Sequence, residues 1–425
     1  MRAWFAGDFE DCLALCDRVR PNDLDMRSQV ALLRARALLR LGHPDAAVDV
    51  VSGAFVAHGT LDASLTARML LGQACVRLGE PERGLSILEA AQRDADDAHP
   101  TIRSEIALNV ALACYRLRRL DEAEAALDRV IPEADIVHAR SLEYRGWVAI
   151  ARADYAAATE HFTAVLRRLD RCRRYDRFLE ATAIQELSIF AAERFDRAAW
   201  LFAEARAERL DWSAAGLANP RHVTALAASM LYEADGRVRD ALRWTRVAED
   251  AALGVGRALL ARCRRAAILR AAGERLAHAD LVAAMRRDLE LLNGASLDGE
   301  ERGLPLALAE EVAYAGDVVG ALALVHRHDE LAVPVRALVT GDPRMAAQRT
   351  FVEAVIADAG GDHRAAHARY QRAFHTFRRL GYERRAVLAA QRLAELTGQP
   401  YLREYLDAAL RKVAARSPLR ERALR

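Results

Sequence analysis

Residues 78–85 read LGEPERGL, and related stretches recur along the whole chain. The copies include LGHPDAAV at 41–48, LRRLDEAE at 117–124, RADYAAAT at 152–159 and AGDVVGAL at 315–322. Successive copies lie roughly 35 to 45 residues apart, which is within the range of periods found in repeat architectures. The sequence therefore predicts an array of similar units stacked one after another.

Each copy has the chemistry of a turn between two helices. A glycine such as Gly79 suits the end of the first helix, because that position often needs a left-handed backbone. An acidic residue or a proline then follows, where the start of the next helix favours it. Small residues recur five positions after the turn glycine, as at Gly84, and seven before it, as at Gly72. Two small residues on facing helices let an antiparallel pair approach closely.

Composition agrees with a helical protein and gives little sign of a nucleic-acid partner. Hydrophobic residues make up 52% of the chain and charged residues 29%, whereas aromatic residues reach only 6%, too few for an all-β protein. The 62 basic residues are balanced by 60 acidic residues. A strongly basic chain would point to DNA or RNA. We therefore expect no direct nucleic-acid binding by this chain.

The pattern resembles the tetratricopeptide repeat (TPR) over nearly the whole chain. The large residue that this repeat has four positions beyond its second small residue is present in five copies, as Leu88, Leu127, Phe162, Phe202 and Tyr370. The tryptophan and the helix-ending proline of the repeat are mostly missing, and the period is longer than usual. The resemblance implies an all-α, right-handed superhelical solenoid of about ten to eleven TPR-like antiparallel helix hairpins. Generic helical-hairpin repeats remain an alternative.

We expect one solenoid over residues 1–425, interrupted at two places. The run LNGASLDGEERGL at 292–304 has the Asn-Gly chemistry of a loop. It is a candidate bend or subdomain boundary. The run LAVPVRALVTGDPR at 331–344 predicts a short helix flanked by prolines.

The resemblance also implies a concave groove lined by the first helix of each hairpin. In TPR-like phasing its ligand-binding residues are Arg36, Arg40, Gln73, Arg77, Tyr115, Arg116, Arg140, Glu143, Trp147, Phe190 and Glu233. Tyr115, Trp147 and Phe190 fall on successive repeats and form either an aromatic ladder or part of the core.

The charges of this groove predict a polarity. Its N-terminal end collects Arg36, Arg40, Arg77, Arg116 and Arg140, and its C-terminal end Glu233, Glu310, Glu311, Asp358 and Glu395. Arginine binds carboxylate or phosphate through paired hydrogen bonds. We expect an acidic peptide or an anionic ligand at the basic end. Ordinary solvated helix faces remain the alternative.

No motif predicts catalysis, a cofactor or a metal, so we expect no enzyme. His363 and His367 share a helix face, but no third ligand is evident, and surface histidines are expected. Cys12 and Cys16 lie at apolar positions and predict buried thiols. The runs RCRR at 171–174 and 262–265 predict solvated faces.

The ends of the chain bear on location and regulation. The N-terminal MRAWFAGDFEDC has no apolar signal region, and no stretch has the length of a membrane span, so we expect a cytoplasmic protein that binds no membrane. Near the C-terminus the residues Ser417, Pro418, Arg420, Glu421, Arg422 and Leu424 resemble the opening of a LuxR-type DNA-binding domain, with Leu419 as an intruder. Regulators similar to the maltose-regulon activator use a TPR superhelix as a sensor.

Two functional hypotheses follow. The first is a non-catalytic scaffold whose groove captures a protein, a peptide or an effector. The alternative is the effector-sensing module of a LuxR-type transcription regulator whose DNA-binding domain is not in this chain. A homodimer remains open, because open-ended stacks expose apolar faces at their terminal repeats.

Overall fold

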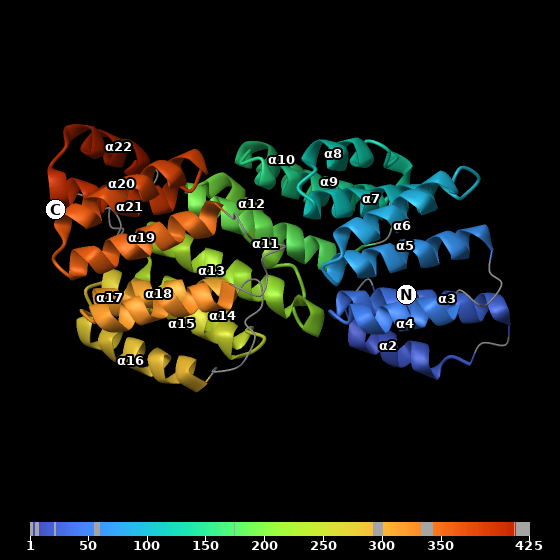
Figure 1. The fold of residues 1–425 in the computed structure, drawn as a ribbon, viewed down its shortest axis with the longest axis horizontal. Helices are drawn as coiled ribbons and strands as arrows, with labels where there is room; N and C mark the ends of the chain where they lie inside the picture. The colour runs from blue at the N-terminus through green and yellow to red at the C-terminus, as the bar shows by residue number, and fades with distance from the viewer. Residues whose placement is uncertain are drawn as a thin grey trace. The chain divides into compact units, whose positions relative to one another are not determined.

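The computed structural model describes residues 3–4, 8–20, 23–54, 60–173, 175–291, 301–332, 343–411 and 413. Across these ranges the regular structure is helical and no strand occurs. The expected all-α fold is confirmed (Figure 1).

The described chain falls into two compact units. The N-terminal unit comprises Met1–Ile184 and Arg209–Leu217, and the C-terminal unit comprises Gln185–Glu208 and Ala218–Arg425.

The N-terminal unit is built from α2 (Phe9–Arg18), α3 (Leu24–Arg40), α4 (Pro44–Ala54), α5 (Leu61–Arg77), α6 (Pro81–Arg93), α7 (Pro100–Arg116), α8 (Leu120–Leu127), η1 (Pro132–Ala134), α9 (Ile136–Ala151), α10 (Tyr155–Leu169), the first part of α11 (Arg177–Arg194) and η2 (Ala215–Leu217).

The C-terminal unit takes the rest of α11, followed by α12 (Arg197–Ala207), α13 (Ala218–Ala234), α14 (Val238–Asp250), α15 (Val255–Ala271), α16 (Arg275–Leu291), η3 (Glu301–Gly303), α17 (Leu304–Tyr314), α18 (Val318–Ala332), α19 (Pro343–Ala359), α20 (His363–Arg379), α21 (Glu383–Thr397) and α22 (Pro400–Leu410).

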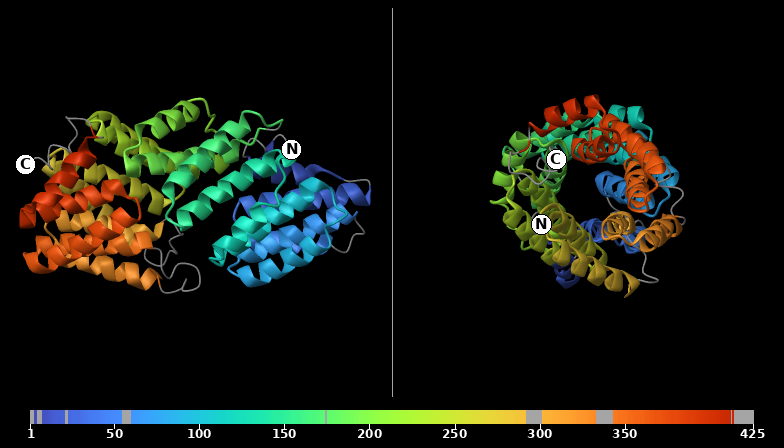
Figure 2. Two further views of the ribbon diagram at one scale, coloured as in Figure 1. Left: turned by 90° about the horizontal axis from the view of Figure 1, so that it is seen from above. Right: turned by 90° about the vertical axis from the view of Figure 1, so that its left-hand side faces the viewer.

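Helices that are consecutive in the chain pack in pairs, so the described residues form a series of hairpins. Pairs such as α5 with α6, α9 with α10 and α19 with α20 make extensive contacts, and Figure 2 shows them from two further directions. Contacts between neighbouring hairpins repeat at the expected period. Arg77 donates to the Leu39 carbonyl at 2.6 Å, and Gln348 donates to Glu310 at 3.2 Å, each across 38 residues. The expected TPR-like hairpins are therefore confirmed.

The turns follow the predicted backbone chemistry. Gly79 has φ +86°, and the next residue, Glu80, donates its N–H to the Cys75 carbonyl at 2.9 Å. This bond ties the end of the first helix to the turn. Arg118 and Ala153, at the equivalent place in two copies without glycine, also have positive φ, +61° in each case. The repeat therefore imposes a left-handed turn residue even where the sequence gives no glycine.

Small residues bring the two helices of a hairpin together as expected. A Cβ on Gly72 would lie 2.6 Å from the side chain of Leu88, and one on Gly84 would lie 2.6 Å from that of Val76. In another hairpin, a Cβ on Gly146 would meet the Phe162 ring. These contacts leave no room for a methyl group, since real Cβ atoms essentially never approach so closely.

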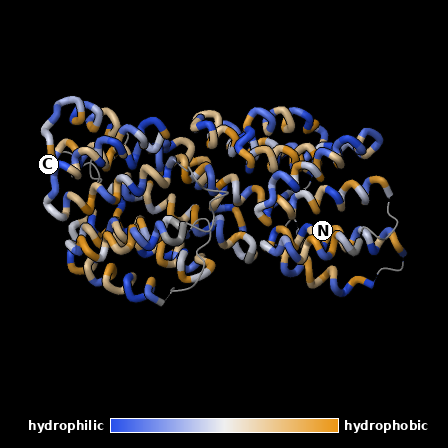
Figure 3. The backbone as a smooth tube through the Cα atoms, in the orientation of Figure 1, coloured by the Kyte–Doolittle hydropathy of each residue, from blue (hydrophilic) through white to orange (hydrophobic). Residues whose placement is uncertain are grey.

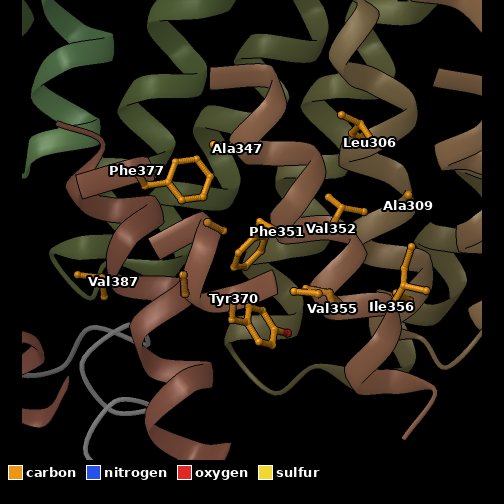
Figure 4. Close-up of a cluster of buried hydrophobic side chains, with 14 of the residues drawn as sticks. Leu306, Ala309, Ala347, Phe351, Val352, Val355, Ile356, Tyr370, Phe377 and Val387 are labelled. Carbon is orange, nitrogen blue, oxygen red and sulfur yellow. The ribbon is translucent and has the colours of Figure 1, made fainter. Parts of the chain in front are cut away.

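Each unit has its own core. Hydrophobic and hydrophilic segments alternate along the helices, as Figure 3 shows, because each amphipathic helix buries one face. In the C-terminal unit, Phe351 of α19 and Tyr370 of α20 meet edge to face with ring centroids 5.7 Å apart, and Val355 lies beside them (Figure 4). Tyr370 is the large residue expected at this position of the repeat.

Some expectations fall on residues that are not described. Residues 292–300 and 333–342 lie outside the described ranges, as do Ser417 to Arg425, which carry the LuxR-type resemblance. The single solenoid with a bend near 292–304 stays a prediction. None of the helices in the described ranges is long and apolar enough to cross a membrane.

Candidate functional site

The first helices of the N-terminal hairpins carry most of the predicted groove residues. Arg36 and Arg40 lie on α3, Arg77 on α5, Arg116 on α7 and Arg140 on α9. These five guanidinium groups differ in what they contact, and the difference separates them into two sets.

Arg36 and Arg140 are held by carboxylates. Arg36 donates to both carboxylate oxygens of Glu105, at 3.3 and 2.6 Å. Arg140 donates to Asp176 at 2.7 Å, and Asp176 is only 1% exposed. Such pairs neutralise the guanidinium and fix its orientation. These two arginines therefore have structural partners already.

Arg40, Arg77 and Arg116 have no carboxylate partner among the described residues, and we call them the open arginines. Arg40 lies over two aromatic rings, with its Cζ 5.8 Å from the Trp4 centroid and 5.0 Å from the Phe178 centroid. Arg77 donates a hydrogen bond to the Leu39 carbonyl, and both Arg77 and Arg116 are exposed.

Desolvation and repulsion between like charges act on two of the open arginines. Burial lowers the pKa of Arg40 to about 10, and the charges of Arg140 and Arg77 lower it further, against the opposite effect of Asp176. Arg77 is exposed at the surface, but the protein around its guanidinium partly desolvates it and lowers its pKa, and the charge of Arg116 adds to this effect. The protein thus holds like charges close together, which is unfavourable unless an anion joins them.

Aromatic side chains accompany these arginines. Trp147 stacks on Tyr144 with ring centroids 4.8 Å apart, and Tyr115 lies 6.5 Å from Trp147. The three rings line one small apolar depression with Leu112. Phe190, the third member of the predicted ladder, is 5% exposed and belongs to the C-terminal unit, so it offers little surface for contact.

The two remaining polar candidates of the N-terminal unit differ in burial. Gln73 is half-buried on α5. Glu143 is buried on α9 and accepts a hydrogen bond from the Thr182 hydroxyl at 2.7 Å. Burial raises the pKa of Glu143 to about 7, although Thr182, Arg40 and Arg140 act in the opposite direction. Near neutral pH Glu143 therefore compensates only part of the positive charge around it.

The C-terminal unit contains a cavity of about 200 Å³, formed by the first helices of its hairpins. Its wall is drawn from α13, α15, α17 and α21. The lining residues are Leu226, Met230, Glu233, Leu260, Cys263, Arg264, Ala267, Arg270, Ala271, Ala307, Glu310, Glu311, Arg384, Arg385 and Leu388. The predicted groove residue Glu233 is among them.

Ion pairs dominate the polar part of this cavity. Glu233 accepts from Arg264 at 2.5 Å and from Arg384 at 3.0 Å. Burial alone would raise the pKa of Glu233, but the two guanidinium groups hold it at about 2. Arg270 donates hydrogen bonds to both carboxylate oxygens of Glu311, each at 2.9 Å. The acidic residues of this wall are thus matched by arginines.

The wall of this cavity differs from the acidic groove end that the sequence predicted. The cavity wall contains four arginines and three glutamates, so it is not an acidic surface. Arg264 belongs to the RCRR run at 262–265, for which a solvated face was expected, yet it is 8% exposed. Local sequence concealed this, because its carboxylate partner Glu233 lies 31 residues away in the chain. The separation of 31 residues is close to one repeat, and this was the signal in the sequence that Glu233 and Arg264 could pair.

The other chemical candidates lie where the sequence suggested. His363 is exposed, and its Nδ1 lies 3.4 Å from a carboxylate oxygen of Asp358. Cys12 and Cys16 are free and buried. Within the described part of the chain, no group of three or more histidine, cysteine, aspartate or glutamate side chains could hold a metal ion.

Comparison with known proteins gives a likeness of fold without a likeness of sequence. No family pattern and no curated protein matches the sequence. A solved Rap protein, complexed with competence and sporulation factor, aligns at a TM-score of 0.54 with 11% identity, over 85% of this chain and 99% of the other.

Two further structures align at lower scores. The human IFIT1 dimer with PPP-AAAA gives a TM-score of 0.47 at 14% identity, over 95% of this chain and 94% of the other. The quorum sensor NprR from B. thuringiensis gives 0.39 at 13% identity, over 91% and 92%. Together with the hairpins, their turn residues and their small-residue contacts, the likeness to the Rap protein shows that this chain has a TPR-type helical-repeat fold.

Proposed function

We propose that this chain is a non-catalytic binding protein whose N-terminal unit holds an acidic segment of a protein or peptide partner. The open arginines Arg40, Arg77 and Arg116 would bind its carboxylates, and Tyr115 and Trp147 would contact its apolar side chains. The observation that carries the proposal is the lack of a carboxylate partner for these three arginines among the described residues.

Physical chemistry supports an anionic partner. Holding several guanidinium groups close together costs free energy unless a counter-charge is nearby. Arginine forms paired, charge-assisted hydrogen bonds with carboxylates, and aromatic side chains often supply much of the binding energy at interfaces. The likeness of fold to a Rap protein solved in complex with competence and sporulation factor is compatible with this role.

Binding rather than catalysis is part of the proposal, as is a cytoplasmic location. The six cysteines are free, and five of them are buried. Thiols that remain unpaired fit a reducing compartment.

The test uses fluorescence anisotropy with a fluorescein-labelled decapeptide of alternating glutamate and leucine. The double variant Arg77→Glu/Arg116→Glu should bind this peptide about tenfold more weakly or worse, because attraction becomes repulsion. The matched control is Arg93→Glu/Arg167→Glu, which makes the same change of charge at exposed positions on the second helices α6 and α10.

The control variant should bind like the unaltered protein, and a glutamine–leucine peptide should bind weakly to all three. Equal losses in both double variants would mean that net charge alone attracts the peptide. No loss in either would reject the open arginines as the binding groups.

The alternative is the effector-sensing role in a LuxR-type regulator. It is motivated by the resemblance of residues 417–424, which lie outside the described ranges. Sequencing the native gene past the codon for Arg425 tests it. A helix-turn-helix segment in the same reading frame would support the regulator, and a stop codon would count against it.

A further inference from the structure

The cavity of the C-terminal unit combines two kinds of surface. Leu226, Met230, Leu260 and Leu388 supply apolar side chains, whereas arginines and glutamates supply the polar part. Small-molecule sites in proteins have this composition, with an apolar lining and a few polar groups that fix orientation. The question is which hydrogen-bonding groups of the wall are still unoccupied.

Two arginines of the wall make an informative contrast. Arg270 uses its Nε and Nη2 to hold the two carboxylate oxygens of Glu311. Arg385 uses only its Nη1, which donates to Glu310 at 3.0 Å. Among the described residues the Nε–Nη2 edge of Arg385 donates to nothing. Arg385 therefore lacks the carboxylate that Arg270 holds at the same edge.

A second donor of the wall is also unoccupied. Arg384 is 5% exposed, and its buried Nε has no hydrogen-bond partner, although its Nη2 donates to Glu233. A buried donor without a partner carries the full cost of its desolvation. The charge of Glu193 also acts on Arg385, but no hydrogen bond or ion pair joins the two side chains in the described ranges.

The acceptors of the wall are better satisfied than its donors. Glu233 accepts from two arginines, Glu311 accepts from Arg270 and lies 2.9 Å from His278 Nε2, and Glu310 accepts from Arg385. The cavity thus has spare donors, and it lies beside apolar side chains. A ligand that fits must bring acceptor oxygens and an apolar body.

We infer that this cavity binds a small carboxylate with a compact apolar body. Its two oxygens accept from the Nε–Nη2 edge of Arg385, and Arg384 adds positive charge to the same wall. Its apolar body contacts Leu226, Met230, Leu260 and Leu388.

The size of the cavity indicates how large an apolar body it can enclose. An apolar cavity of about 150 Å³ holds a benzene ring. The 200 Å³ observed here therefore admits a phenyl or branched aliphatic group with its carboxylate. A free carboxylic acid and the C-terminal end of a peptide share this chemistry. The site goes beyond the proposed function, because it lies in the other unit and takes a different ligand.

The probes for isothermal titration calorimetry are phenylacetate and its neutral analogue phenylacetamide. We expect saturable binding of phenylacetate and at least tenfold weaker binding of phenylacetamide. Acetyl-Ala-Ala-Phe, as the free acid and as the C-terminal amide, identifies the source. Tighter binding of the peptide acid than of phenylacetate assigns a chain end, and the reverse assigns a free acid. Equal binding of acid and amide in both pairs, or no saturable binding of any probe, overturns the inference.

Variants localise the site. Arg385→Lys keeps the charge but loses the paired donors, and should weaken phenylacetate binding at least tenfold. Ala267→Leu places a larger side chain in the cavity and should abolish phenylacetate binding. This second variant tests the site independently if Arg385→Lys does not fold. The matched control is Arg349→Lys, since Arg349 of α19 pairs with Asp329 away from the cavity wall. Unchanged affinity in both cavity variants overturns the site.

The double variant Arg77→Glu/Arg116→Glu separates this inference from the proposed function. Its phenylacetate affinity should equal that of the unaltered protein, whatever happens to the acidic peptide. If the variant lost affinity for both phenylacetate and the acidic peptide, the two sites would not be independent.

Discussion

The open arginines of the N-terminal unit differ from the arginines of the C-terminal cavity in whether a carboxylate faces them. In the N-terminal unit Arg40, Arg77 and Arg116 have no carboxylate partner among the described residues. In the C-terminal unit the arginines of the cavity wall all pair with glutamates, as Arg264 and Arg384 do with Glu233. All these residues lie on the first helices of hairpins. Position in the repeat therefore does not decide the role of an arginine, whereas the presence of a facing carboxylate does.

The energetics of the two arrangements differ accordingly. Removing one partner of a buried ion pair leaves an uncompensated charge and costs about 3–5 kcal/mol. Changing an exposed arginine costs about 1 kcal/mol or less. Substitutions in the buried ion pairs of the C-terminal cavity should therefore mainly lower the stability of the protein. Substitutions of Arg77 and Arg116 should mainly weaken binding.

The largest effect is expected from Glu233→Gln. This change leaves Arg264 and Arg384 buried without their carboxylate, so the free energy of unfolding should fall by about 3–5 kcal/mol. Urea unfolding followed by circular dichroism measures it. Glu353→Gln is the control, because Glu353 is an ion-paired but partly exposed glutamate of the same unit and should cost about 1 kcal/mol or less. Equal losses of stability in the two variants would mean that burial does not decide how much an ion pair contributes.

The pH dependence of stability should have opposite signs at two glutamates. The pKa of Glu143 is about 7 in the folded protein against an ordinary value of 4.5, so its contribution to stability falls as pH rises from 4.5 to 7. The pKa of Glu233 is about 2, so its contribution is complete above pH 4.5 and is lost as pH falls towards 2.

The variant Glu143→Gln isolates the first effect. Relative to the unaltered protein, it should gain roughly 2–3 kcal/mol in the free energy of unfolding between pH 5 and pH 8. Urea titrations at the two pH values measure this gain. A stability difference that is the same at both pH values would mean that Glu143 titrates normally.

Overpacking a hairpin should lower the stability of both units by a similar amount, in contrast to the charge substitutions. Gly84→Ala in the N-terminal unit adds a Cβ to a close contact within a hairpin, and Ala321→Val in the C-terminal unit adds two methyl groups at a fully buried position. Each should cost about 1–3 kcal/mol through overpacking. Ser86→Ala, at an exposed position of α6, is the control. A large cost in one unit alone would show that the units differ in more than their charges.

The fold could be predicted because its determinants are local. The turn residue at Gly79 and the small residues Gly72 and Gly84 recur within one repeat, and each acts on helices that are adjacent in the chain. Their spacing alone identified the hairpins.

The site could be predicted only in part, because charge pairing is not local. Arg384 and Glu233 are 151 residues apart in the chain, and nothing in their neighbourhoods links them. Periodicity placed Arg36 and Arg77 on first helices, but it could not show that Arg36 pairs with Glu105 while Arg77 has no carboxylate. Nor could it show that Phe190 is buried, since core and groove positions share the same helical spacing.

A charge-reversal experiment tests most directly whether the open arginines bind the partner. The affinities of the glutamate–leucine decapeptide and of a lysine–leucine decapeptide would be measured for the unaltered protein and for Arg77→Glu/Arg116→Glu. We predict that the preference reverses, with the variant losing the acidic peptide and gaining the basic one. If the variant kept its preference for the acidic peptide, the open arginines would not be the binding groups.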